Sequence, residues 1–481
     1  MILSNIILIN GYRTGYPTLP AGIGYIAQAI EDAGFNYDVC DVNLQTHDQI
    51  LQIIINSNPK YVGLGTMTYE VEKNYHLLAS IHNLKPNIKI VLGGPQAIAA
   101  GEKIFQECHA VDIVVQGEGE ESIVKILQGI ELYKIPGVMT RDSHEVAIIN
   151  KFLNVDSISF PKYNKFDLDK YGKTMQIASS RGCVYQCSFC GAPKFLGNKW
   201  RPFRLERMIE EFKYWYVKGY RNFYFSDSLF ALNKKRVIDF CAYIVASNYK
   251  ESSFTADGFR ADHLDYEILQ HMRRANFNSI TIGVESVNDD TLRFFRKGES
   301  FSQIDEAISI ADALGFNITV YLIIGAPEEA YNDAYKSIQY PKKYKNIVSA
   351  IYSKLMPILG TPYYDYAIEH KLVFDSTLYY PKIEAYGTNE KYNSYNAVEN
   401  MWNSLYPIIE KTSRFLLIRN NIKKELNYNA FNNLSVNVLN ILTYISSNRT
   451  IFKILCALIH IAKLIKLNRV FNLRKHNILN T

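Results

Sequence analysis

Three cysteines within eight residues carry the clearest chemical signal in the chain. Cys183, Cys187 and Cys190 form a C-x3-C-x2-C run that follows a predicted strand and a glycine. Thiolates are soft ligands that select iron–sulfur clusters or zinc, and three on one loop can bind three irons of a cubane cluster. No fourth cysteine lies nearby, and His109 and His263 do not lie at the spacing of a zinc motif. Since a structural zinc site needs four ligands, the run favours an iron–sulfur cluster.

This cysteine spacing resembles the cluster-binding signature of the radical S-adenosylmethionine (radical SAM) superfamily. The resemblance implies a 4Fe-4S cluster on the three cysteines, with S-adenosylmethionine chelated by the open fourth iron. Further segments resemble, in order, the ends of the family's later strands: 223–230, 259–262, 281–286, 321–329 and 360–362. The residues that the resemblance implies for S-adenosylmethionine binding are Phe189, Ser226, Asp227, Arg260, Glu285, Gly325 and Pro327.

Several of these residues also have an ordinary structural explanation. Asp227 can cap a helix, Arg260 and Glu285 can form a structural ion pair, and Gly325 can belong to a plain turn. We expect the family roles because the segments follow one another at successive predicted strand ends.

Residues 1 to 150 alternate apolar, strand-like runs with helical patterns. Continuous apolar strands separated by helices predict a parallel sheet covered on both faces. Five such strands fit a doubly wound, Rossmann or flavodoxin-like domain that binds ligands beyond the carboxyl ends of its strands. The five runs are Ile6–Ile9, Tyr37–Cys40, Tyr61–Gly65, Ile88–Leu92 and Val111–Val115.

Glycines and polar residues follow three of these strands, and their pattern is informative. Together with the segment 17–25 and with Asp38 and Asp41, they resemble the cobalamin-binding domain of cobalamin-dependent radical enzymes. No D-x-H-x-x-G string occurs, so the resemblance implies cobalamin without a histidine on its lower face. Many relatives have histidine where this chain has Gln96, so no polar contact is predicted there. The implied cobalamin-binding residues are Thr18, Leu19, Thr66, Met67, Gly93, Gly94, Gly117, Glu118 and Gly119.

A second strand–helix series begins at Gln176 and predicts a partial or full (β/α) barrel, with chemistry at the carboxyl ends of its strands. After about Tyr386 the pattern becomes helical and rich in Asn and Tyr. The chain length of 481 residues suits about three domains. We expect an α/β protein with a cobalamin-binding-like domain (1–150), a linker (151–173), a radical SAM core (174–386) and a helical C-terminal domain (387–481).

Charge and composition limit the kinds of binding partner that we expect. The net charge of +6 is smaller than the contribution of seven basic residues after Glu425, a segment without acidic residues. A nucleic-acid-binding surface on the main body is therefore not expected. The start of the chain lacks the pattern of a signal peptide, so we expect a cytoplasmic protein. The tail segment 451–466 fits either a core helix or a basic amphipathic helix that touches anionic lipid or an acidic peptide. Cys241 and Cys456 fit core positions.

The resemblance as a whole implies a cobalamin-dependent radical SAM enzyme. The expected reaction is methyl transfer to an unactivated carbon of a small-molecule or natural-product substrate, with electrons from an external flavodoxin or ferredoxin. Two alternatives remain: cyclisation or ring rearrangement with the same cofactors, and a non-catalytic cobalamin or cluster carrier. A transfer-RNA methylthiotransferase is disfavoured, because it needs three further N-terminal cysteines and the first 180 residues contain only Cys40 and Cys108. The sequence predicts neither the catalytic residues nor the substrate.

Overall fold

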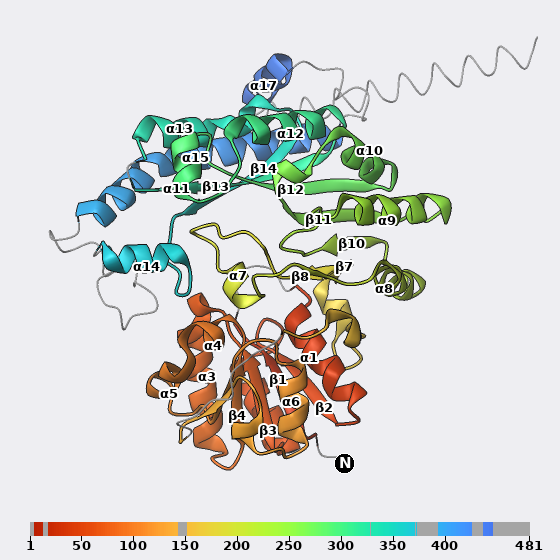
Figure 1. Cartoon of the computed structure of the whole chain (residues 1–481), viewed down its shortest axis with the longest axis vertical. Coiled ribbons are helices and arrows are strands. Elements are labelled where there is room, and N and C mark those ends of the chain that lie inside the picture. The colour runs from red at the N-terminus through yellow and green to blue at the C-terminus, as the bar shows by residue number, and fades with distance from the viewer. Residues whose placement is uncertain are drawn as a thin grey trace, which may run out of the picture.

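The computed structural model describes residues 4–12, 18–142, 152–327, 329–370, 372, 393–425 and 436–445. Two six-stranded sheets, the first mostly and the second wholly parallel, form the body of this part of the chain. Figure 1 shows the N-terminal unit below and the second, larger unit above it. Among the described residues no helix is long and apolar enough to cross a bilayer.

The first sheet has six strands in the order β2-β1-β3-β4-β5-β6. The first five run parallel, which confirms the expected flavodoxin-like order, and β6 is antiparallel to β5. The sequence did not predict β6, because three residues are too few to show a pattern. The strands are β1 (Ile6–Asn10), β2 (Tyr37–Asp41), β3 (Tyr61–Gly65), β4 (Lys89–Gly93), β5 (Ile113–Val115) and β6 (Val138–Thr140).

Helices cover both faces of this sheet, and this explains its continuous apolar strands. Every residue of β1 is buried, including the polar Asn10. The polar contact of Asn10 is internal, since its side-chain amide donates to Asp41 Oδ2 at 2.7 Å. The helices are α1 (Ala21–Asp32), α2 (His47–Ser57), α3 (Val71–Leu84), α4 (Pro95–Ala100), α5 (Ile104–Glu107) and α6 (Glu120–Leu127).

The second sheet has six parallel strands in the order β14-β13-β12-β11-β10-β7. Strand neighbours follow chain order and β7 does not pair with β14, so this part of the chain forms an open, partial barrel. On β11, Phe254 and Ala256 are buried, whereas Thr255 and Asp257, which alternate with them, are half-buried on the opposite face. The strands are β7 (Thr174–Ile177), β10 (Asn222–Phe225), β11 (Ser253–Phe259), β12 (Phe277–Glu285), β13 (Asn317–Ile324) and β14 (Ile347–Lys354).

Helices line the outer side of the second sheet, and α10, α12 and α13 lie on the side away from the N-terminal unit (Figure 1). Below the sheet, the short hairpin of β8 (Ser180–Arg181) and β9 (Arg201–Pro202) encloses the cysteine loop and α7 (Ala192–Phe195). Cys241 is buried in the core, as expected. The other helices are α8 (Leu205–Val217), α9 (Lys234–Ala246), α10 (Tyr266–Arg274), α11 (Asp289–Phe294), α12 (Phe301–Ala313), α13 (Tyr331–Gln339) and α14 (Pro362–Glu369).

The described part of the C-terminal region is helical, as predicted, and consists of α15 (Asn393–Glu425) and α17 (Val436–Ile445). Helix α15 packs against β14 and α13, where Leu405 and Ile409 join the buried Ile324 and Ile338. This helix therefore completes the core of the second unit. The predicted tail helix 451–466, with Cys456, lies outside the described residues.

The segment between the two sheets does more than connect them. Tyr163 is 4% exposed and contacts Trp215 of the second unit, with ring centroids 5.9 Å apart. A Cβ on Gly24 of α1 would lie 2.4 Å from the Tyr163 ring, so only glycine fits there. The Tyr171 hydroxyl donates to Asp41 Oδ2 at 2.7 Å. Residues 152–173 thus pack into both units at once.

Candidate functional site

The cysteine loop begins at a glycine that no other residue can replace without rearrangement. Gly182 has φ +86°, and a Cβ there would lie 2.1 Å from the Lys199 carbonyl oxygen. The Cys183 amide donates to the Gly197 carbonyl at 3.0 Å. The turn at Gly182 therefore holds Cys183 against residues 197–199, the segment through which the loop returns to β9.

The three thiols lie close enough to influence one another's ionisation. Burial raises the pKa of all three, that of Cys187 to about 11, while the Lys297 ammonium acts in the opposite direction. A thiolate ligand is favoured by a nearby cation. Within the described ranges, no three His, Cys, Asp or Glu side chains converge on one metal ion. A cubane cluster does not need such convergence, because each thiolate binds a different iron.

The second half of the loop is fixed by backbone hydrogen bonds. The Ser188 amide donates to the Phe295 carbonyl at 2.9 Å, and the Ser188 carbonyl accepts from the Tyr363 amide at 2.8 Å. The Phe189 ring packs edge-on against Phe295, at a centroid distance of 5.3 Å. The aromatic residue between the last two cysteines thus anchors the loop to the turn after α11.

A buried chain of charges lies beside the thiols. Lys297 Nζ lies 3.2 Å from Glu285 Oε1 and 3.4 Å from Glu299 Oε2, and Arg260 Nη2 lies 3.5 Å from Glu299 Oε2. Arg260 also pairs with Asp262 at 2.8 Å. Glu285 therefore pairs directly with Lys297, and the direct Arg260–Glu285 pair considered from sequence does not form.

Sequence reasoning missed Lys297 and Glu299, although Lys-Gly-Glu after a helix was a usable signal. Glu285 ends β12 with φ +62°, a strained backbone conformation for any residue other than glycine. Burial raises the pKa of Glu285, and the Lys297 ammonium opposes this rise. The strained backbone turns the carboxyl toward the cations beside the cysteine loop.

Asp227 braces the strand that leads into the loop. Its carboxylate accepts from the Ser179 amide at 3.2 Å, from Ser179 Oγ at 3.0 Å and from Ser180 Oγ. The residue is 4% exposed, and burial raises its pKa. Ser226 before it is half-buried, and its amide donates to the Ile177 carbonyl at 3.1 Å. The hydrogen bonds of Asp227 point to the segment before the cysteines.

The turn after β13 is held by a glutamate that sequence reasoning also missed. Gly325 has φ +99°, and its amide donates to Glu329 Oε2 at 2.7 Å, which closes the turn that contains Pro327. Glu329 is 8% exposed and its Oε1 has no hydrogen-bond partner. Burial raises the pKa of Glu329 to about 7. The signal was a glutamate four residues after the strand-end glycine.

The rim of the N-terminal sheet brings together most of its predicted residues. The Thr66 amide donates to the Gly93 carbonyl at 3.1 Å, and a Cβ on Gly94 (φ +87°) would lie 3.0 Å from Thr66 N. Leu19 is buried and Thr18 is exposed. Gln96, at the first turn of α4, is fully buried, and neither atom of its amide has a hydrogen-bond partner. The close glycine packing fits a rim whose backbone approaches a ligand.

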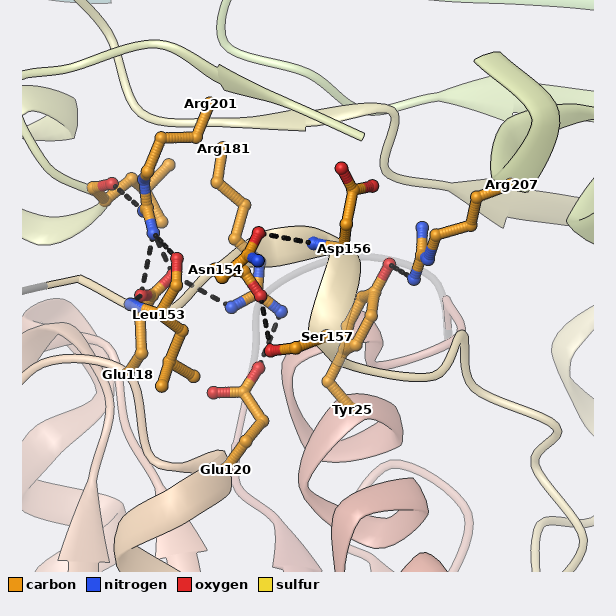
Figure 2. Close-up of polar contacts among 11 residues, drawn as sticks. Tyr25, Glu118, Glu120, Leu153, Asn154, Asp156, Ser157, Arg181, Arg201 and Arg207 are labelled. Carbon is orange, nitrogen blue, oxygen red and sulfur yellow. Dashed lines mark hydrogen bonds and ion pairs between the residues drawn. The ribbon is translucent and has the colours of Figure 1, made fainter. Parts of the chain in front are cut away.

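Glu118 on this rim has a different surrounding from its neighbours. Figure 2 shows it pointing at Arg181 and Arg201 of the β8–β9 hairpin, with Glu120 beside Arg181. Burial alone would raise the pKa of Glu118, but Arg201 and Arg181 outweigh this effect and lower it. Since α7 also packs against α4, the rim and the cysteine loop face each other.

The two units match two family models. The radical SAM superfamily model matches residues 177–340, and the B12 binding domain model matches residues 8–127. An uncharacterised methyltransferase of Pyrococcus horikoshii is 30% identical over 372 residues, or 74% of this chain and 79% of that protein. An anaerobic magnesium-protoporphyrin IX monomethyl ester cyclase of Cereibacter sphaeroides is 24% identical over 334 residues, or 64% of this chain and 54% of that protein.

A solved structure agrees with these matches at the level of the fold. The cobalamin-dependent S-adenosylmethionine radical enzyme OxsB, with aqua-cobalamin and S-adenosylmethionine bound, has a TM-score of 0.71 at 17% identity. The match covers 96% of this chain and 76% of that one. With both family models matched and a 30% identical relative of similar extent, this chain belongs to the cobalamin-dependent radical S-adenosylmethionine enzymes.

Proposed function

We propose that this chain is a methyltransferase that places a methyl group on an unactivated carbon of a small molecule or natural product. The observation that carries the proposal is the arrangement of two sites. The cysteine loop faces the glycine-rich rim of the N-terminal sheet, through α7 and α4. Two cofactors placed on these surfaces lie on opposite sides of the same space, which is what a shared substrate requires.

The proposed ligand sets follow the matched motifs. Cys183, Cys187 and Cys190 are the proposed cluster ligands, and their loop supports this because it carries three unpaired thiols. We propose that S-adenosylmethionine contacts Phe189, Ser226, Asp227, Arg260, Glu285, Gly325 and Pro327. We propose that cobalamin lies over Thr18, Leu19, Thr66, Met67, Gly93, Gly94, Gly117 and Gly119. The domain limits 1–150, 174–386 and 387–481 belong to the same proposal, with the third region packed against the second unit through α15.

When bound, the cluster supplies an electron to S-adenosylmethionine and cobalamin supplies the methyl group. The chain's own residues then have three tasks. Glu285 and Lys297 present a carboxylate and an ammonium beside the loop, which suits the charged amino and carboxylate ends of S-adenosylmethionine. The turn closed by Glu329 places the backbone of Gly325 and Ala326 where we propose that S-adenosylmethionine binds. The half-buried face of the second sheet, with Thr255 and Asp257, offers polar groups to a substrate.

We further propose an external electron donor of the flavodoxin or ferredoxin type, because the described residues include no second cysteine cluster to relay electrons. A reducing compartment such as the cytoplasm suits three unpaired cysteines on one loop. Contact of the tail helix with anionic lipid or an acidic partner stays a prediction, since residues 451–466 lie outside the described part of the chain.

A cyclase or ring-rearranging activity is the second candidate, and the likeness to the Cereibacter sphaeroides cyclase favours it. The two activities differ in what becomes of S-adenosylmethionine. Methyl transfer consumes one molecule for its methyl group and leaves S-adenosylhomocysteine, whereas cyclisation does not transfer that methyl group.

The test is therefore a product analysis on the anaerobically reconstituted chain. It receives hydroxocobalamin, reductant and S-adenosylmethionine labelled in the methyl group. A methyltransferase is expected to form both 5′-deoxyadenosine and S-adenosylhomocysteine, with the labelled methyl group transferred to the reduced cobalamin in the mixture. Formation of 5′-deoxyadenosine alone would favour the cyclase, and absence of both products would contradict an enzyme of either kind.

A further inference from the structure

Two glutamates of the N-terminal unit and two arginines of the second unit form one interdomain ion-pair cluster: Glu118, Glu120, Arg181 and Arg201 (Figure 2). We propose that Glu118 is a positioning residue that fixes the cysteine loop against the N-terminal rim, and that it is not a direct contact of cobalamin. The inference rests on the proposed function for the identity of the two cofactors.

The first step of the argument is the number of hydrogen bonds that Glu118 already accepts. Its Oε1 accepts from Arg181 Nη1 at 2.9 Å and from Arg201 Nη2 at 3.0 Å. Its Oε2 accepts from Arg201 Nη1 at 2.8 Å and from the Leu153 amide at 2.9 Å. A carboxylate has about four acceptor positions. All four are used within the protein, so this side chain has none left for a ligand.

The second step is the place of the two arginines in the chain. Arg181 and Arg201 are directly paired residues of β8 and β9. The cysteine loop, Gly182 onward, starts at the next residue after Arg181. Glu118 therefore joins both strands at the base of the hairpin that carries the three cysteines. A shift of Glu118 would be passed to Cys183 through two residues of backbone.

The third step compares the two kinds of contact between the N-terminal unit and the second unit. Tyr25 of α1 stacks on Phe203 with an interplanar angle of 3°, and the Arg207 guanidinium lies 3.7 Å from the Phe203 ring centroid. This aromatic contact buries apolar area, so it can hold the units together without Glu118. The two-pronged Arg201–Glu118 bond instead has strict geometry and specifies the register between the units.

A direct cofactor contact by Glu118 is the competing explanation, since Gly117 and Gly119 beside it lie on the predicted cobalamin rim. The two explanations differ in their consequences. Loss of a cofactor contact lowers the affinity for cobalamin, whereas loss of a positioning contact leaves the affinity and changes the geometry between the cofactors.

The experiment compares full-length wild type with Glu118→Gln, which keeps the size of the side chain and removes its charge. Glu121→Gln is the matched control, because Glu121 lies three residues later, in the first turn of α6, has 58% of its side chain exposed and pairs with Lys125 of its own helix. Arg201→Lys is the second test variant, since it keeps the charge but loses the two-pronged bond.

The first measurement needs no cofactor. In hydrogen–deuterium exchange of the metal-free chain, we expect amides of residues 182–200 to exchange at least tenfold faster in E118Q and R201K, and at the wild-type rate in E121Q. Unchanged exchange in both test variants would overturn the positioning role. This result also stands if wild type binds no cobalamin, an outcome that would refute the proposed function alone.

The second measurement uses the chain loaded with cluster and hydroxocobalamin. We expect E118Q to bind hydroxocobalamin within threefold of the wild-type affinity. We also expect the magnetic interaction between the reduced cluster and cob(II)alamin, read from the paramagnetic resonance line shape, to differ from wild type. Cobalamin affinity at least tenfold lower in E118Q, with an unchanged line shape, would overturn the inference in favour of a direct contact.

Discussion

Glu211 makes the stability of this protein depend on pH in the neutral range. Its carboxyl, on α8, is 2% exposed, and burial raises its pKa to about 8. The Arg207 guanidinium opposes this rise, but it stacks on Phe203 and stays 3.7 Å from Glu211 Oε2. Glu211 Oε2 has no hydrogen-bond partner, so the charged carboxylate gains no hydrogen bond through that oxygen to offset its burial.

The sign and size of the effect follow from proton linkage. In the unfolded chain the glutamate titrates at 4.5, so the folded state binds the additional proton between pH 4.5 and about 8. The resulting stabilisation is fully present below pH 4.5 and is lost as the pH rises through about 8. At 1.36 kcal/mol per pKa unit, Glu211 contributes roughly 3 kcal/mol at pH 6 and almost nothing at pH 9.

Glu211→Gln imitates the neutral carboxyl and removes its titration. We expect the unfolding free energy of wild type, relative to that of E211Q, to fall by about 2 to 3 kcal/mol between pH 6 and pH 9. The assay is denaturant unfolding of both chains over this range, in which other titrating groups cancel. Glu210→Gln, on the exposed side of the same helix, is the control and should run parallel to wild type. Parallel curves for E211Q and wild type would refute the reasoning.

Three further predictions concern single side chains. Asp227→Asn weakens the hydrogen bonds to Ser179 and Ser180 and should cost about 2 to 3 kcal/mol in denaturant unfolding; an unchanged midpoint would show that Asp227 braces nothing. Glu329→Ala frees the Gly325 amide and should weaken S-adenosylmethionine binding to the cluster-loaded chain at least tenfold in equilibrium dialysis. Wild-type affinity in that variant would rule out the turn as part of the site. Leu405→Asp puts a charge at a fully buried position on the inner face of α15 and should give insoluble protein, whereas Tyr406→Asp, at a position 49% exposed on the same helix, should stay soluble. Equal solubility of the two would mean that α15 does not complete the core.

The sequence predicted the sheets well because their strands carry strong local patterns. All five expected strands of the first sheet are present. The sequence did not predict β6, because its pairing with β5, and not a pattern in its own three residues, makes it a strand. The packing of residues 152–173 was not predicted for the same reason, because the residues that Tyr163 and Tyr171 contact lie far away in the chain.

The site was predictable where one motif carries it and unpredictable where contacts cross between units. The cysteine loop could be located from spacing alone. The partners of Arg260 and Glu285 could not, because Lys297 and Glu299 become their neighbours only when β11 and β12 lie side by side. Glu118 is the clearest case. Its glycine-flanked position suggested a ligand contact, whereas two arginines of the other unit surround it.

The central claim is that one chain holds both a cluster on its three cysteines and a cobalamin on its N-terminal rim. The most direct measurement is paramagnetic resonance and absorbance of the anaerobically reconstituted chain, compared with the Cys183→Ala, Cys187→Ala, Cys190→Ala triple variant. The account predicts both cofactor signals in wild type, with no nitrogen splitting from a histidine on cob(II)alamin. In the triple variant it predicts cobalamin without a cluster. A normal cluster in the triple variant, or a wild-type chain that binds no cobalamin, would contradict it.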